Sequence, residues 1–203
     1  MQLQWSEACE RNKGPILEVL EAELKAPLTV LEIGSGTGQH AVYFSQQLPH
    51  LRWQPSDQGE YLAGLCARVE QEGGDNLLPP VALDVLCASW PDEARRAEAV
   101  FSANTLHIMS WPAVVATFAG VGEVLAPGQW FLSYGPFSEE GRHNSDSNRE
   151  FDAFLRQRDP ASGIRDIRDL EALAAEHGLV LTRRWPMPAN NRILGWQRLR
   201  SHA

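Results

Sequence analysis

The chain has 203 residues, of which 43% are hydrophobic and 22% charged, and its formal net charge is -8 at pH 7. This size and composition are typical of a globular domain, and the acidic balance disfavours a protein that binds nucleic acid through a basic surface. No apolar run approaches a membrane span, no export signal begins the chain, and Cys9, Cys66 and Cys87 form no CxxC pair, so we expect a cytoplasmic protein with reduced cysteines and no membrane partner.

Strand-length apolar runs alternate with stretches of helical period, which predicts an α/β fold built of βα units. A helical lead-in at 1–27 precedes predicted strands at 28–33, 51–55, 81–85, 99–103 and 130–134, with helices at 39–47, 61–70, 92–96 and 111–125 between them. A polar insertion at about 138–148 comes next, followed by helices at 149–157 and 167–177 and strands at 179–185 and 193–199. The last two strands are close enough to pair as an antiparallel hairpin. We therefore predict that 1–203 is a single domain with a mostly parallel, seven-stranded sheet.

A glycine-rich loop, Glu-Ile-Gly-Ser-Gly-Thr-Gly at 32–38, joins the first strand to the next helix, where doubly wound sheets hold cofactors. A dinucleotide fingerprint would place its third glycine at position 39, which is Gln39. The spacing resembles instead the E-x-G-x-G-x-G motif of class I S-adenosylmethionine-dependent methyltransferases. That resemblance implies a Rossmann-like three-layer sandwich that binds S-adenosylmethionine through Glu32, Gly34, Ser35, Gly36 and Gly38. Taken alone, a glycine-rich turn is equally compatible with a tight connection between strand and helix.

Two acidic residues follow the next two predicted strands. Asp57 ends the second strand, 19 positions after Gly38, close to the offset of about 20 residues at which an acid meets ribose hydroxyls. Asp84 ends the third strand, and in the methyltransferase pattern it faces the adenine amino group, with the backbone of Val85 beside the ring. The alternatives are that Asp57 caps the next helix and that Asp84 faces solvent.

Longer segments resemble one family of methyltransferase-like proteins, the domain-of-unknown-function 938 family that includes methyltransferase-like protein 26. The resemblance spans nearly the whole chain, and the segments that carry it are 10–17, 31–40, 53–57, 104–108, 134–137, 145–148, 163–166 and 186–191. It implies a fold and a cofactor and leaves the methyl acceptor open.

Further positions are candidates for binding and chemistry. Asn12 and Lys13, predicted to precede the first helix, could hold the methionine carboxylate or form a solvated helix start. Asn104, at the end of the fourth strand, is expected near the sulfonium. His107 is the candidate base or substrate-orienting group, because an imidazole titrates near neutrality. Tyr134 is expected on the acceptor side. A structural role is the alternative for His107, and a place in the core for Tyr134.

The predicted function is methyl transfer from S-adenosylmethionine to a small molecule or a protein. Residues 104–107, Asn-Thr-Leu-His, differ from the N/D-P-P-Y segment associated with methylation of DNA bases, so no DNA partner is expected, whereas an RNA acceptor and the oligomeric state stay open. The six histidines show no metal-ligand spacing, and no metal is expected. Residues 141–144 and the pair Asn190-Asn191 could form a substrate rim or solvated loops. Two other functions remain, a catalytically silent module that binds the cofactor and a partner protein, and a nicotinamide-dependent oxidoreductase, which Gln39 and the terminal hairpin disfavour.

Overall fold

The computed structural model of the chain describes residues 3–199, which divide between two compact units, Met1–Phe101 and Ser102–Ala203. The elements of the first unit are α1 (Glu7–Glu23), β1 (Thr29–Ile33), α2 (Gln39–Gln47), β2 (Arg52–Asp57), α3 (Leu62–Glu72), β3 (Val81–Ala82), α4 (Asp92–Arg95) and β4 (Ala99–Ala103), whose last two residues cross the boundary. Those of the second unit are α5 (Trp111–Val124), β5 (Trp130–Gly135), β6 (Phe137–Glu139), β7 (Arg142–His143), α6 (Asp146–Arg158), β8 (Arg165–Asp166), α7 (Ile167–Glu176), β9 (Leu179–Met187) and β10 (Asn191–Arg198).

Seven strands form one sheet in the order β3-β2-β1-β4-β5-β10-β9. In this sheet β1 pairs in parallel with β2 and β4, and β2 pairs in parallel with β3. The terminal strand β10 pairs antiparallel with both β5 and β9. These pairings confirm the predicted α/β fold, with its mostly parallel seven-stranded sheet and its antiparallel terminal hairpin.

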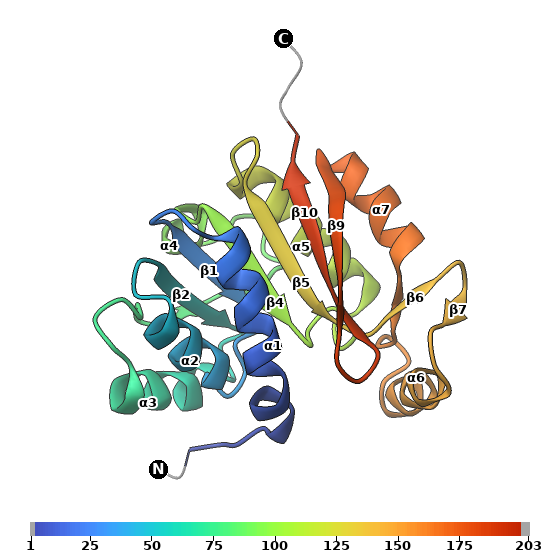
Figure 1. Cartoon of the computed structure of the whole chain (residues 1–203), viewed down its shortest axis with the longest axis horizontal. Coiled ribbons are helices and arrows are strands. Elements are labelled where there is room, and N and C mark those ends of the chain that lie inside the picture. The colour runs from blue at the N-terminus through green and yellow to red at the C-terminus, as the bar shows by residue number, and fades with distance from the viewer. Residues whose placement is uncertain (1–2, 200–203) are drawn as a thin grey trace. The chain divides into compact units, whose positions relative to one another are not determined.

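The first unit is organised around an aromatic cluster under its parallel strands. Figure 1 shows α1 and α2 lying beside each other, and α2 packs against β2. Phe44 of α2, Trp53 of β2 and Phe101 of β4 are fully buried, with ring centroids 5.4 to 5.8 Å apart. Central parallel strands are apolar because both of their faces are covered, and four of the five residues of β1 are buried.

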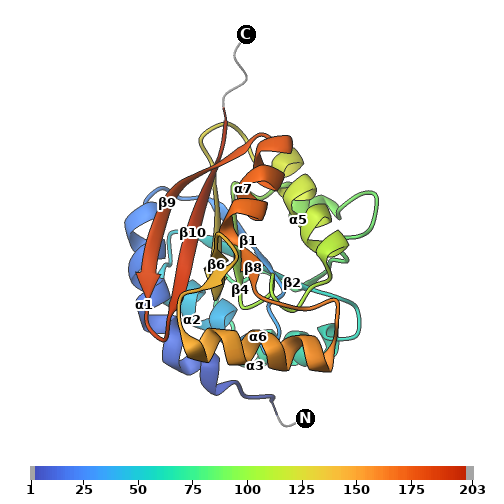
Figure 2. The same cartoon turned by 90° about the vertical axis from the view of Figure 1, so that its right-hand side faces the viewer.

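The second unit packs α5 and α7 closely together and carries an additional small sheet. The two helices lie side by side in Figure 2. Their close approach depends on Gly122, since a Cβ atom at that position would lie 2.5 Å from the carbonyl oxygen of His177. Three short strands form the additional sheet in the order β7-β6-β8, and α6 lies next to β7. The core joins Phe118, Phe131 and Trp196 through edge-on ring contacts.

Two predicted positions of site residues are wrong. Asn12 and Lys13 lie inside α1, which begins at Glu7 because the side chain of Ser6 accepts a hydrogen bond from the Cys9 N–H and caps the helix. Asp84 does not end the third strand, since β3 stops at Ala82. The Asp84 carboxylate accepts from the Leu86 N–H at 2.9 Å, and this local turn competes with extension of the strand.

The polar insertion contains more regular structure than its composition predicts. β6 and β7 form a short hairpin within it, and β6 pairs in parallel with β8, which was not predicted. α6 begins at Asp146 rather than at 149, because Ser145 caps it by accepting from the Asn148 N–H. The connection expected at 186–191 shrinks to a turn at 188–190, where Ala189 and Asn190 have positive φ, since β9 extends to Met187 and β10 starts at Asn191.

Within residues 3–199, no helix combines the length and the apolar character needed to cross a membrane. Cys9, Cys66 and Cys87 are free thiols.

Candidate functional site

The glycine-rich loop between β1 and α2 adopts a conformation that requires glycine. Gly34, Gly36 and Gly38 have φ angles of 74°, 54° and 75°, a left-handed region that side chains disfavour. At Gly38 there is also no room, because a Cβ atom would lie 2.8 Å from the Leu65 side chain. At Gly36 the opposite holds. That residue is exposed and a Cβ atom would meet nothing within 4 Å, so the middle of the loop faces open space.

Asp57 connects the end of β2 to the centre of this loop. Its Oδ2 atom accepts from the Gly36 N–H at 2.7 Å, and its Oδ1 atom accepts from the Gln58 N–H at 2.8 Å. Partial burial raises the pKa of Asp57 above its ordinary value. The structure thus brings together two residues that the sequence predicts for one cofactor site and that lie 21 positions apart.

Glu32 lies beneath the loop and is buried. Its Oε2 atom accepts from the indole N–H of Trp53 at 3.0 Å and from the Ser35 hydroxyl at 2.9 Å. Burial raises the pKa of Glu32 to about 7. Both donors approach the same oxygen, so the carboxyl group connects Ser35 of the loop to Trp53 of β2. These contacts of Glu32 are made within the protein.

Three further contacts that the sequence did not reveal fix the loop from the other side. Arg68 of α3 is buried, and its Nε atom donates to the Thr37 carbonyl at 2.6 Å. The Gln39 amide contacts the Ser6 backbone, accepting from its N–H at 2.6 Å, and donates to Glu10 at 3.0 Å. A lone arginine in a helix and a glutamine after a glycine carry no sequence signal for such roles.

Asn12 and Lys13 lie next to α2 and already have partners. The Oδ1 atom of Asn12 is 2.7 Å from Nε2 of His40, and burial lowers the pKa of His40 to about 4. The Lys13 ammonium lies 2.6 Å from Glu10 and 4.8 Å from the ring centroid of Tyr43. Both residues therefore belong to the contact between α1 and the helix that follows the loop.

The residues predicted to contact the adenine, Asp84 and Val85, are less closely connected to the glycine loop. Asp84 is exposed and its carboxylate forms the local turn described above, whereas Val85 is buried. The Leu83 N–H donates to the Asp57 carbonyl at 2.9 Å, so this segment still starts beside the end of β2. No contact joins Asp84 to the glycine loop among the hydrogen bonds of residues 3–199.

The second unit holds the predicted acceptor-side residues. Asn104 follows β4 with a φ of 56°, and its N–H donates to the carbonyl of Tyr134, which is buried in β5. His107 is buried in the next turn, where its ring meets Phe151 edge-on at 5.5 Å and its carbonyl accepts from the Gly163 N–H at 2.9 Å.

The environment of His107 keeps its imidazole neutral. Burial, with a further contribution from the positive charge of Arg165, lowers the pKa of His107 to about 4. A neutral imidazole can accept a hydrogen bond at pH 7, but a conjugate acid with this pKa makes it a weak base.

Two of the predicted rim residues, Asn144 and Asn190, meet in a polar cluster. The amide of Asn144 and that of Asn148 both donate to the carbonyl of Asn190, at 2.9 and 3.1 Å. This cluster joins the start of α6 to the turn between β9 and β10. Within residues 3–199, no three His, Cys, Asp or Glu side chains come together as a possible metal-binding group.

Solved structures similar to this chain include three O-methyltransferases. An O-methyltransferase family 2 protein from Planctomyces limnophilus, crystallised with apigenin, is 17% identical over 95% of this chain and 58% of its own, with a TM-score of 0.81. An O-methyltransferase family protein from Burkholderia thailandensis is 14% identical over 97% of this chain and 59% of its own, with a TM-score of 0.79. The mitomycin 7-O-methyltransferase MmcR is 17% identical over 94% and 54%, with a TM-score of 0.78.

These likenesses establish the class I methyltransferase fold, and the chain spans less than three fifths of the length of each of these proteins. A family model described as "Protein of unknown function (DUF938)" matches residues 3–198. Since that match covers nearly the whole chain, the protein belongs to the DUF938 family.

Proposed function

We propose that the chain binds S-adenosylmethionine at the 34–38 loop and transfers its methyl group to a small molecule or a protein. The observation that carries the proposal is the contact between Asp57 and Gly36, which places a carboxylate beside a left-handed glycine loop. The similarity of the fold to O-methyltransferases supports it. Within the DUF938 family, we further propose that the chain is similar to methyltransferase-like protein 26.

The residues of the loop fit the adenosyl group. Each oxygen of the Asp57 carboxylate accepts one backbone N–H, and a carboxylate offers about four acceptor positions, so about two remain for the ribose hydroxyls. The open space over Gly36 lets a ligand approach the main chain. Glu32 and Ser35 then support the loop from beneath.

Further cofactor contacts are part of the same proposal. Asn12 and Lys13 would hold the methionine carboxylate, since the Asn12 oxygen faces His40 and its amide donor is left for a ligand. Asp84 and the backbone of Val85 would face the adenine, and Asn104 would lie near the sulfonium. The predicted role of Asp84 requires it to exchange its contact with the Leu86 N–H for one with the ligand.

The cofactor would supply a methyl group bonded to a sulfonium. A nucleophile that bonds to the methyl carbon in line would displace the neutral thioether, so the main task of the protein is to position the two reactants. Positioning can contribute roughly 7–11 kcal/mol of the barrier. We propose that His107 and Tyr134 contact the acceptor. Because the pKa of His107 is about 4, its imidazole would orient an acceptor that is already nucleophilic at neutral pH, rather than remove a strongly held proton.

Calorimetric titration with S-adenosylhomocysteine, the demethylated cofactor, tests the proposal. We expect saturable binding by the wild-type protein and roughly 10- to 100-fold weaker binding by Asp57→Ala, because a hydrogen bond to a charged group contributes on the order of 1.5–3 kcal/mol. Asp75→Ala, which removes an exposed acid of the same unit, serves as the control and should bind normally. A folded wild-type protein that shows no saturable binding would refute the cofactor assignment.

A second measurement separates an enzyme from a silent module. Incubation of the wild-type protein with a methyl-labelled donor and fractionated cell extract should transfer label to an acceptor. Binding of the cofactor without any label transfer would favour the silent module, and binding of a nicotinamide cofactor instead would favour an oxidoreductase.

A further inference from the structure

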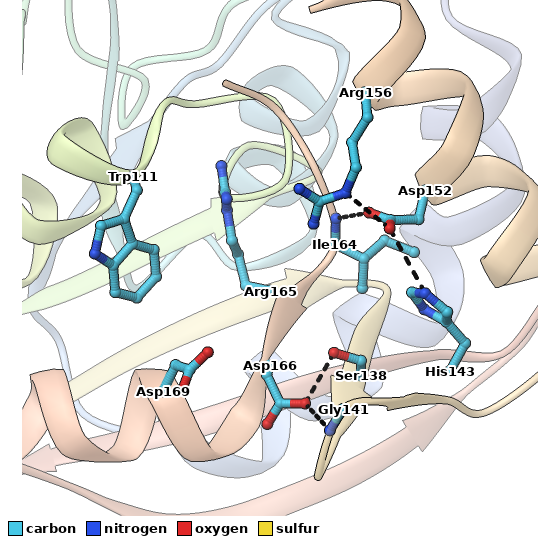
Figure 3. Close-up of a pocket in the computed structure, with 10 residues that line it drawn as sticks. All are labelled: Trp111, Ser138, Gly141, His143, Asp152, Arg156, Ile164, Arg165, Asp166 and Asp169. Carbon is cyan, nitrogen blue, oxygen red and sulfur yellow. Dashed lines mark hydrogen bonds and ion pairs between the residues drawn. The ribbon is translucent and has the colours of Figure 1, made fainter. Parts of the chain in front are cut away.

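The second unit contains a polar cavity of about 260 Å³. It lies between the β6–β7 hairpin, α6, the start of α5 and the segment that runs through β8 into α7 (Figure 3). The side chains that could bind a ligand there are Trp111, His143, Asp152, Arg156, Arg165, Asp166 and Asp169.

Two of the three wall carboxylates already accept hydrogen bonds within the protein. Asp152 accepts from Nε of Arg156 at 2.9 Å and from the Ile164 N–H at 2.7 Å. Asp166 accepts from the Gly141 N–H at 2.7 Å and from a serine hydroxyl at 3.0 Å, and it also caps α7. The dashed contacts in Figure 3 show that both carboxylates turn toward these partners. The formal charges of the wall therefore overstate how well the cavity could hold a cation.

The two arginines keep unused donors. Arg165 is buried, and its Nε atom donates to the Leu106 carbonyl at 3.0 Å while Nη2 donates to the carbonyls of Met109 and Ala161. Among the residues that the structure describes, no carboxylate pairs with this guanidinium, and its Nη1 atom has no hydrogen-bond partner. Burial and the neighbouring charge of Arg156 both lower the pKa of Arg165, as expected for two like charges that share a polar site.

Arg156 is held in place beside this group. Its guanidinium covers Gly163, where a Cβ atom would lie 2.6 Å from Nη2. Only Nε of Arg156 is engaged by Asp152, which leaves both Nη groups without a partner in residues 3–199. In Figure 3 the side chain of Arg165 runs between those of Arg156 and Trp111. The indole ring lies 5.9 Å from the Arg165 guanidinium carbon, and Trp111 is 39% exposed.

We propose that this cavity binds a small organic anion, whose carboxylate or phosphate lies between Arg156 and Arg165 and whose flat apolar part lies against Trp111. The two arginines offer such an anion N–H donors that have no partner within residues 3–199. A guanidinium group can donate two parallel hydrogen bonds to a carboxylate or to a phosphate. Because its contacts with backbone carbonyls immobilise Arg165, little side-chain entropy is lost when an anion binds.

The site is also connected to the predicted acceptor side of the same unit. The carbonyls of Leu106 and Met109 that hold Arg165 flank His107 in sequence. The N–H of Gly163, the residue covered by Arg156, donates to the His107 carbonyl. An anion in the cavity would thus stabilise the turn that carries His107.

Calorimetric titration with benzoate and, separately, with inorganic phosphate tests the proposal without any methyl donor, so its outcome is independent of the proposed cofactor. Arg156→Gln should weaken both ligands roughly 10- to 100-fold, because it removes charge-assisted hydrogen bonds. The matched control is Arg149→Gln, which removes an exposed arginine of the same helix that also pairs with an aspartate within one turn. Its affinities should equal those of the wild type.

Trp111→Ala separates the two parts of the ligand. We expect it to weaken benzoate and to leave phosphate unchanged, since only benzoate has a ring to place against the indole. Far-ultraviolet circular dichroism of each variant establishes that it is folded. Equal affinities in Arg156→Gln and Arg149→Gln, or no saturation of the wild type by either probe, would overturn the proposed site, and an unchanged benzoate affinity in Trp111→Ala would overturn its aromatic wall.

Discussion

Replacement of Glu32 by Gln should remove a pH-dependent loss of stability from the protein. Glu32 is 2% exposed, and its Oε2 atom accepts from Trp53 and from Ser35. A glutamine has nearly the same shape, and its amide oxygen can accept from both donors. The variant therefore keeps the contacts that hold the loop and loses only the capacity to ionise.

The sign and size of the effect follow from the pKa of Glu32. Burial raises this pKa from an ordinary value of 4.5 to about 7, so between these pH values the folded state holds a proton that the unfolded state releases. Stability is then lost as the pH rises from 4.5 to 7. At about 1.4 kcal/mol per pKa unit, the loss amounts to about 3 kcal/mol.

Urea denaturation of the wild type and of Glu32→Gln at pH 5, 6, 7 and 8 measures this contribution. The difference between the two proteins cancels the titration of all other groups. We expect the variant to gain up to about 3 kcal/mol relative to the wild type between pH 5 and pH 8. A difference that changes by less than about 1 kcal/mol over this range would show that the carboxyl group is not desolvated as the structure indicates.

Two further predictions concern stability. Gly38→Ala should destabilise the protein by roughly 2–4 kcal/mol, because it combines a left-handed backbone with a clash at Leu65, whereas Gly64→Ala, inside α3 with open space around it, should stabilise by roughly 0.5–1 kcal/mol. Thermal and urea unfolding of both variants measure the contrast, and equal effects would contradict the loop conformation. His107 should contribute a loss of about 3 kcal/mol as the pH falls from 6.5 to 4, measured as the difference between the wild type and His107→Gln, because the lowered pKa of this buried imidazole opposes its protonation in the folded state. His107→Gln should lack this loss in the same urea titrations. If the stability of the wild type and that of the variant depended on pH in the same way, the imidazole would be exposed to solvent.

The sequence predicts the parts of the fold that depend on periodic burial. The strands at 99–103 and 130–134 and the helix at 111–125 agree with β4, β5 and α5 to within a residue, because long apolar patterns and the stop at Pro127-Gly128 define them. Gly178, which follows α7, has a positive φ, as is typical of a glycine that ends a helix. Contacts made by polar side chains were less predictable. The cap at Ser6 and the turn at Asp84 each depend on hydrogen bonds over only two or three residues, and the spacing of apolar residues does not predict them.

The candidate site likewise combines contacts that the sequence predicts with contacts that it does not. The glycine motif and the offset of Asp57 are local signals, and the structure places Asp57 on the loop as that spacing suggests. The supporting residues come from elsewhere in the chain, as Arg68 does from α3 and Trp53 from the middle of β2. Such contacts depend on how elements pack, which a single sequence does not encode in a readable spacing.

These supporting contacts affect the free energy of ligand binding at the loop. The loop is held at Gly36 by Asp57, at Ser35 by Glu32 and at Thr37 by Arg68, so three consecutive residues are fixed by side chains from three different strands and helices. Ordering a loop on binding opposes affinity, and a loop that is already ordered avoids that loss. Two of the three anchors, Glu32 and Arg68, are buried, whereas Asp57 is half-buried and keeps acceptor positions for a ligand. Substitution of Asp57 should therefore affect the shape of the loop and its direct contact with the ligand together, while Glu32→Gln should leave cofactor affinity unchanged.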